Sequence, residues 1–188
     1  MIAIIAEKPS VGLDIARVVG ADTRNDGYCS GNGYMVTWAL GHLVSLAMPD
    51  TYGYTKTAAE DLPMLPDPFR LISRQMRTDR GMVTDIAASK QLKVIESVFN
   101  RCDSIIVATD AGREGELIFR WIYAFLECTK PFRRLWISSL TDEAIRKGLE
   151  ELKDGSEYDS LYAAADSRAK ADWLVGMNAS RALAIVSG

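Results

Sequence analysis

The chain has 188 residues, of which 48% are hydrophobic and 25% are charged, and its formal net charge is −3. This composition suits a globular domain with an appended piece, and the weak negative charge excludes a protein that coats DNA nonspecifically. No apolar run reaches the roughly 18 residues of a membrane span, and Glu7 interrupts the first apolar segment too early for a secretory signal. We therefore expect a soluble, cytoplasmic protein.

The first half of the chain predicts a strand, a helix and a hairpin. Residues 2–6 form an apolar run, and residues 9–19 continue with the apolar spacing of a helix that opens on proline. Residues 28–40 are rich in β-forming side chains around Gly31-Asn32-Gly33, which predicts two strands and a tight turn. Residues 48–68 are rich in proline and predict an irregular connection.

The second half alternates helices with strands. A helical face across residues 92–99 precedes an apolar strand at 104–108, and apolar pairs across 117–126 mark the clearest helix. Residues 135–138 predict another strand, and Thr141 is expected to cap the helix that follows. This alternation predicts an α/β fold with a mainly parallel sheet between helices, whose ligands gather at the carboxyl ends of the strands.

The amino-acid composition changes after residue 154. A long alanine-rich helical stretch follows at residues 158–185. We therefore place one domain at residues 1–154 and the start of a second, helical domain at 155–188. Because an apolar helix ends the sequence without a polar tail, we expect the chain to be part of a longer protein.

An acidic motif follows the strand predicted at residues 104–108. Asp110 leaves the strand, Gly112 permits an open turn, and Glu114 enters the next helix. If the first strand lies beside this one, Glu7 joins the other two carboxylates, and three converging carboxylates repel one another unless a cation intervenes. Magnesium fits best, because zinc would require histidine or cysteine ligands that are not nearby.

Two basic residues are adjacent to these acids in sequence. Lys8 and Arg113 could place positive charge on a phosphodiester bound to the same metal. A purely structural interpretation remains open, since aspartate often follows a strand in doubly wound proteins and Glu114 would favour the helix dipole in any case. The three cysteines predict free thiols, and the four tryptophans are interpreted as core residues.

Several segments resemble the Toprim domain of type IA DNA topoisomerases, with a topoisomerase III character at the start. The segments are Ile5-Ala-Glu-Lys-Pro-Ser10, Gly41-His-Leu43, Ala108-Thr-Asp-Ala-Gly-Arg-Glu-Gly-Glu-Leu-Ile118 and Arg134-Leu-Trp-Ile-Ser-Ser-Leu-Thr141. The stretch from Arg168 to Leu183 resembles the opening helix of the domain that follows Toprim in this family. The resemblance implies a Toprim fold, in which a mainly parallel four-stranded doubly wound sheet carries an inserted hairpin.

The resemblance also implies roles for the acidic motif and its neighbours. Glu7 would work close to the scissile phosphate, and Asp110 and Glu114 would hold magnesium, with Glu7 as a further ligand. Lys8 and Arg113 would assist at the phosphate.

Further residues would contact or orient DNA. By resemblance these are His42, Arg134, Arg168, Asp172 and, more weakly, Arg181. From the residues alone, Arg168 and Asp172 are an ordinary surface ion pair one helical turn apart. His42 fits a hydrogen-bonded structural histidine equally well.

The sequence departs from the family pattern in two ways. Many members carry a second aspartate where this chain has Gly112, so we expect a single magnesium ion held by Asp110, Glu114, Glu7 and waters. The family's nucleophilic tyrosine follows a motif that none of the tyrosines here matches: Tyr28, Tyr34, Tyr52, Tyr54, Tyr123, Tyr158 and Tyr162. We therefore predict that this chain alone relaxes no DNA.

The resemblance implies an ATP-independent enzyme that cleaves and rejoins single DNA strands through a 5′-phosphotyrosine. It would relax, decatenate or unlink recombining DNA, with single-stranded or underwound duplex DNA as its partner, at the bacterial nucleoid. One alternative is a stand-alone Toprim nuclease or recombination factor that hydrolyses phosphodiesters with magnesium. Another is a phospho-acceptor or nucleotide-binding module, although no Gly-rich phosphate-binding motif is present.

Overall fold

A computed structural model describes residues 1–79 and 81–187. Within these residues a central seven-stranded sheet has the order β11-β10-β9-β1-β4-β3-β2. Its strands in chain order are β1 Ile2–Ala6, β2 Thr23–Asn25, β3 Tyr28–Gly31, β4 Tyr34–Trp38, β9 Ser104–Ala108, β10 Phe132–Arg134 and β11 Lys153–Asp154. The four inner strands β10, β9, β1 and β4 run parallel, and the remaining three pair antiparallel at the two edges.

The helices cover both faces of the sheet. They are α1 Pro9–Val19, α2 Ile86–Arg101, α3 Arg113–Phe125, α4 Asp142–Glu150 and α5 Asp159–Ser187. Alternate residues of β1 point to opposite faces, as expected for a strand. Ile4 packs with α1 and α4 in one hydrophobic cluster, whereas Ala3 and Ile5 pack with α2, α3 and α5 in the other.

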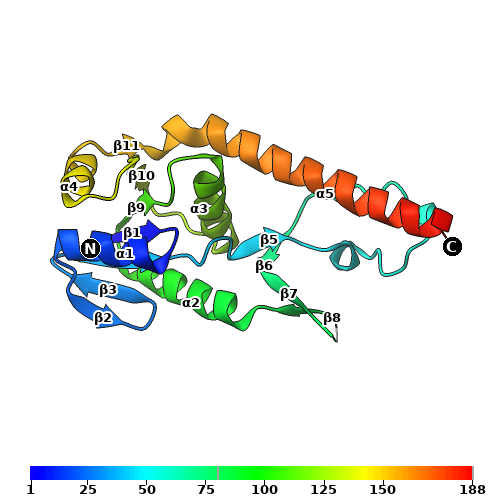
Figure 1. Cartoon of the computed structure of the whole chain (residues 1–188), viewed down its shortest axis with the longest axis horizontal. Helices are drawn as coiled ribbons and strands as arrows, with labels where there is room; N and C mark the ends of the chain where they lie inside the picture. The colour runs from blue at the N-terminus through cyan, green and yellow to red at the C-terminus, as the bar shows by residue number, and fades with distance from the viewer. Residues whose placement is uncertain (80, 188) are drawn as a thin grey trace.

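Smaller elements fill the connection between β4 and α2. They are β5 Val44–Leu46, the 3-10 helices Pro49–Tyr52 and Ala59–Asp61, β6 Leu71–Ser73, β7 Gln75–Thr78 and β8 Gly81–Thr84. A further 3-10 helix, Gly155–Tyr158, lies between β11 and α5. In Figure 1 the β7–β8 hairpin projects from the body of the molecule. Among the described residues, no helix is both long and apolar enough to cross a membrane.

Helix α5 is long: it begins near β11, passes α3 and continues to the C-terminus at the right of the view (Figure 1). Ala165 and Trp173 on this helix are buried in the hydrophobic cluster that covers one face of the sheet. The Trp173 indole donates a hydrogen bond of 2.9 Å to the Ala47 carbonyl oxygen. The helix predicted at residues 158–185 is thus confirmed, and it packs against the hydrophobic cluster on one face of the sheet; the division into two domains at residue 154 stays a prediction.

The structure confirms the α/β fold, its parallel four-stranded core and the hairpin predicted at residues 28–40, but corrects two expectations. The hairpin consists of β3 and β4, and because β4 also pairs parallel with β1, it belongs to the main sheet. The strand expected at residues 135–138 is wrong, since β10 spans Phe132–Arg134; of the expected residues, Leu135 still bonds to β9, donating its N–H to the Val107 carbonyl. Trp136 is 40% exposed and stacks on Tyr158, so it is not a core residue.

Candidate metal and phosphate site

Parallel pairing of β1 with β9 brings two of the predicted acids together. Ala6 lies opposite Ala108 at the carboxyl ends of these strands, so the residues that follow emerge at the same sheet edge. The Asp110 backbone N–H donates a hydrogen bond of 3.0 Å to Oε2 of Glu7. The predicted approach of Glu7 to the acidic motif is therefore present in the fold.

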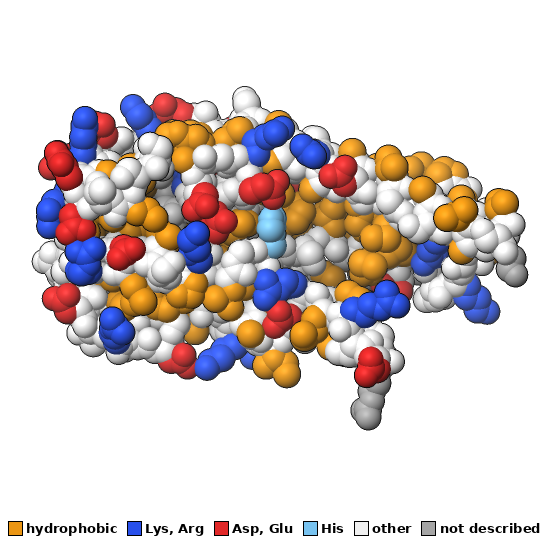
Figure 2. Space-filling view, in the orientation of Figure 1, with side chains coloured by type: hydrophobic (Ala, Val, Ile, Leu, Met, Phe, Trp, Pro, Cys, Tyr) orange, Lys and Arg blue, Asp and Glu red, His pale blue; other side chains and the backbone are white. Residues whose placement is uncertain are grey.

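These residues line an open cleft of about 540 Å³ between the sheet edge and helix α5. The lining consists of Glu7, Asp110, Gly112, Arg113, Glu114, Gly115, Ala165, Arg168 and Asp172. One wall is therefore the acidic motif, and the other is the middle of α5. Figure 2 shows acidic and basic side chains intermixed around the single histidine on one face of the molecule.

The turn between β9 and α3 is held closed by a side-chain hydrogen bond and a close backbone contact. The Thr109 hydroxyl donates a hydrogen bond of 2.7 Å to the Gly115 carbonyl oxygen. A methyl group at Gly115 would overlap the backbone of Asp110, so glycine permits this close approach. Gly112 precedes α3 in an extended conformation, and a methyl group there would meet nothing within 4 Å.

Glu114 lies in the first turn of α3, where the helix dipole favours a negative charge. Its Oε2 atom is 3.1 Å from Nε2 of His42. Arg74 fixes the backbone of the segment that carries His42, because its guanidinium donates hydrogen bonds of 3.0 Å to the Leu40 carbonyl and 2.9 Å to the His42 carbonyl. His42 is thus placed at the acidic motif.

Arg74 is in turn held by Asp85. The Arg74 guanidinium lies 2.7 Å from Oδ2 of Asp85 and lowers the pKa of that carboxyl group. Asp85 also caps α2, because its Oδ1 accepts hydrogen bonds from the backbone N–H groups of Ala87 and Ala88. Sequence reasoning missed this support for His42, since Arg74 and Asp85 stand in no motif.

Some of the predicted basic residues line the cleft and others do not. Arg113 and Arg168 line the cleft, and Arg168 lies 3.8 Å from Asp172, with both side chains largely exposed. Lys8 is exposed next to Glu7 in sequence but does not line the cleft. Arg168 and Asp172 therefore face the acidic motif across the cleft.

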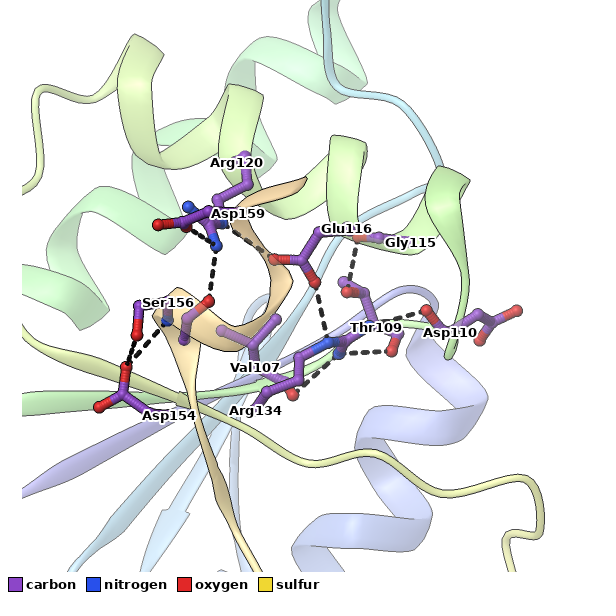
Figure 3. Close-up of polar contacts among 11 residues, drawn as sticks. Val107, Thr109, Asp110, Gly115, Glu116, Arg120, Arg134, Asp154, Ser156 and Asp159 are labelled. Carbon is purple, nitrogen blue, oxygen red and sulfur yellow. Dashed lines mark hydrogen bonds and ion pairs between the residues drawn. The ribbon is translucent and has the colours of Figure 1, made fainter. Parts of the chain in front are cut away.

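Arg134 and Arg181 differ from the expected DNA contacts. Arg134 is only 1% exposed, and its guanidinium binds Glu116 and backbone carbonyl groups beneath the acidic motif (Figure 3). Arg181 donates hydrogen bonds of 2.7 Å and 2.6 Å to the carbonyl oxygens of Tyr54 and Lys56. Direct DNA contact by Arg134 is corrected to a buried structural position, and Arg181 is occupied in holding a loop.

The chemistry of the cleft suits magnesium better than a softer metal. Carboxylate oxygens of Glu7, Asp110, Glu114 and Asp172 are hard ligands of the type that magnesium prefers. In the arrangement described for residues 1–79 and 81–187, no three histidine, cysteine, aspartate or glutamate side chains are grouped closely enough to hold an ion. Glu114 instead lies beside His42, with Oε2 3.1 Å from Nε2 of the imidazole.

Residues 2–140 match the family model described as the Toprim domain, and the chain belongs to this family. It is 50% identical over 185 residues to the DNA topoisomerase 3 of Shouchella clausii and 47% identical over 184 residues to that of Bacillus subtilis. Each alignment covers 96% of this chain and 24% of the relative, so the chain spans about a quarter of their length. The chain is therefore a DNA topoisomerase 3-like Toprim protein.

Among solved structures, the chain is similar to full-length topoisomerase I from Thermotoga maritima. The TM-score is 0.49 at 18% sequence identity, and the match covers 81% of this chain and 21% of that one.

Proposed function

We propose that this chain is the magnesium- and phosphate-binding part of an ATP-independent type I DNA topoisomerase. The whole protein would cleave and rejoin single DNA strands through a 5′-phosphotyrosine, and would thereby relax or decatenate DNA. The observation that carries the proposal is the cleft in which Glu7, Asp110 and Glu114 face Arg168 on α5. Its partner is single-stranded or underwound duplex DNA, without a bound nucleotide, in the bacterial cytoplasm at the nucleoid.

In this proposal the acids and bases of the cleft have complementary tasks. Asp110 and Glu114, with Glu7, hold one magnesium ion, which would neutralise charge on the phosphate at the site of cleavage. Arg113 and Arg168 provide charge-assisted hydrogen bonds to phosphate oxygens, with Lys8 at the rim. Without a cation the carboxylates would repel DNA, so binding at the cleft should depend on magnesium.

The nucleophile is proposed to lie in another part of the whole protein. No tyrosine is among the described residues that line the cleft. The chain by itself should therefore leave negatively supercoiled plasmid unrelaxed in the presence of magnesium. Nicked or linear plasmid from clean protein would instead favour a magnesium-dependent Toprim nuclease.

The test is binding of a fluorescent single-stranded oligonucleotide, measured by anisotropy with magnesium or with EDTA. We expect magnesium to strengthen binding and Asp110→Asn to remove most of that gain. Glu150→Gln removes an exposed carboxylate on α4, outside the cleft, and should behave like the wild type. Binding that ignores both magnesium and Asp110→Asn would contradict the proposed site.

A further inference from the structure

A buried ionic network lies directly beneath the acidic motif (Figure 3). Glu116 and Arg134 are each 1% exposed, and Nε of Arg134 is 3.0 Å from Oε2 of Glu116. Glu116 stands two residues after Glu114 on α3, whereas Arg134 ends β10. The proposed metal and phosphate chemistry uses neither of these side chains.

Both terminal nitrogens of Arg134 reach the end of β9 and the turn after it. Nη1 donates hydrogen bonds of 3.0 Å to the Val107 carbonyl and 2.7 Å to the Thr109 carbonyl. Nη2 donates one of 2.8 Å to the carbonyl of Asp110. One planar guanidinium therefore holds three backbone carbonyls at the point where the chain presents Asp110 to the cleft.

Glu116 extends the network toward the opposite wall of the cleft. Its Oε1 atom accepts a hydrogen bond of 2.9 Å from Nε of Arg120. Nη2 of Arg120 in turn lies 2.8 Å from Oδ1 of Asp159 and donates a 2.8 Å hydrogen bond to the Gly155 carbonyl. Asp159 is the first residue of α5, the helix that carries Arg168. The network thus joins both walls of the cleft.

Stability alone does not explain these buried charges. Desolvation of a buried ion pair offsets most of its Coulombic gain, and apolar side chains of similar volume are often equally stable. Burial also lowers the pKa of Arg134 despite the adjacent Glu116 carboxylate. An arginine at this place does, however, supply several donors in a fixed geometry, which no apolar residue and no lysine can supply.

We propose that Arg134 and Glu116 are positioning residues that fix the Asp110 backbone and set the spacing between the two walls of the cleft. Magnesium and phosphate then bind to a turn that is already ordered. The part of this inference that concerns magnesium rests on the proposed function, whereas the ordering of the turn stands without it.

The first readout is magnesium affinity of the 188-residue chain, measured by calorimetric titration. Arg134→Lys keeps the charge but cannot reach Glu116 and all three carbonyls, and we expect it to weaken binding on the order of tenfold, as supporting residues around metal sites do. The matched control is Arg133→Lys, since the exposed Arg133 guanidinium donates to the Leu152 carbonyl at the surface, away from the acidic turn. The control should keep wild-type affinity.

The second readout needs no metal. Amide hydrogen exchange should accelerate in Arg134→Lys across residues 110–115, while the rest of the sheet keeps its protection. Glu116→Gln removes the charge that aligns Arg134 with Arg120, and should accelerate exchange in the same turn and at the start of α5. Arg120→Lys is the milder variant if either substitution prevents folding, because it keeps a positive charge between Glu116 and Asp159.

The outcomes separate the two proposals. Wild-type protein that binds no magnesium would overturn the proposed metal site, and the exchange experiment would still decide the role of Arg134. Uniform acceleration of exchange over the whole sheet would show a merely structural role and overturn the positioning role. If the wild type binds magnesium, unchanged magnesium affinity in a folded Arg134→Lys protein would also overturn the positioning role.

Discussion

Replacing Gly112 with aspartate tests whether the cleft is built to hold a cation. The position can accept a side chain, because its backbone is extended and a methyl group there meets nothing within 4 Å. Gly112 also immediately precedes α3 and lines the cleft. An aspartate would thus enter the cleft beside Asp110 and Glu114, and it would cap the helix as well.

Without metal, Gly112→Asp has two opposing effects on the free energy of unfolding: better helix capping stabilises the fold, and repulsion from the neighbouring carboxylates destabilises it. Aspartate caps a helix better than glycine by a few tenths of a kcal/mol, and its charge at the helix N-terminus adds about 0.3–1 kcal/mol. Repulsion between exposed carboxylates costs about 1 kcal/mol for a pair about 4 Å apart in water. Stability without magnesium should therefore change by no more than about 1 kcal/mol. With magnesium the added ligand should lower the dissociation constant about tenfold, which corresponds to about 1.4 kcal/mol.

Calorimetric titration with magnesium, combined with thermal unfolding at several magnesium concentrations, measures both effects. Gly112→Asn is the matched control, because it has the same shape and also caps helices but adds no charge. Only Gly112→Asp should gain affinity and show a larger magnesium-dependent rise in melting temperature. Equal affinities of the two variants, or a fold lost in both, would refute the reasoning.

Three further predictions concern the supports of the site. Gly115→Ala should shift the acidic turn and weaken magnesium binding, because the added methyl group would overlap the Asp110 backbone. Gly176→Ala, on the open face of α5, is the control and should stabilise the protein by about 0.5–1 kcal/mol. Similar effects of the two substitutions in calorimetric titration and urea unfolding would count against this geometry. Trp173→Ala should lower the free energy of unfolding in urea by about 3–5 kcal/mol, because a buried indole is lost, and a loss below about 1 kcal/mol would mean that α5 does not share the core. Since Arg74 lowers the pKa of Asp85, this carboxylate stabilises the fold above the ordinary aspartate pKa of about 4, and its contribution is lost as the pH falls through the lowered pKa. The stability difference between wild type and Asp85→Asn, which keeps a helix cap, should therefore shrink on acidification below about pH 4 in urea titrations, and a constant difference would contradict the ion pair.

Much of the fold follows from local patterns in the sequence. The apolar runs at residues 2–6 and 104–108 are β1 and β9, and the cap predicted at Thr141 is present, with its hydroxyl accepting from the Ala144 N–H. These features depend on a few adjacent residues, and their burial matches their pattern. The same strands place Glu7 beside Asp110, so the core of the candidate site was predictable as soon as β1 and β9 were expected to be neighbours.

Other features depend on contacts between distant segments. The resemblance implies that Arg134 contacts DNA, and only the fold shows that it is buried with Glu116. The short strands β5 to β8 lack a clear alternating pattern and are defined by pairing with one another. Glu116 lies two residues after Glu114 in the same acidic segment. Its burial does not follow from its position in the sequence, so the sequence alone assigns it no role.

The most direct test of the account is to locate the cation in the chain itself. Manganese can replace magnesium at oxygen-rich sites and broadens the nuclear magnetic resonance signals of nearby amides. We predict broadening centred on the amides of Glu7, Asp110 and Glu114, reversed by excess magnesium and much reduced in Asp110→Asn. Broadening centred on another acidic surface, such as residues 59–61, with these three amides unaffected, would contradict the account.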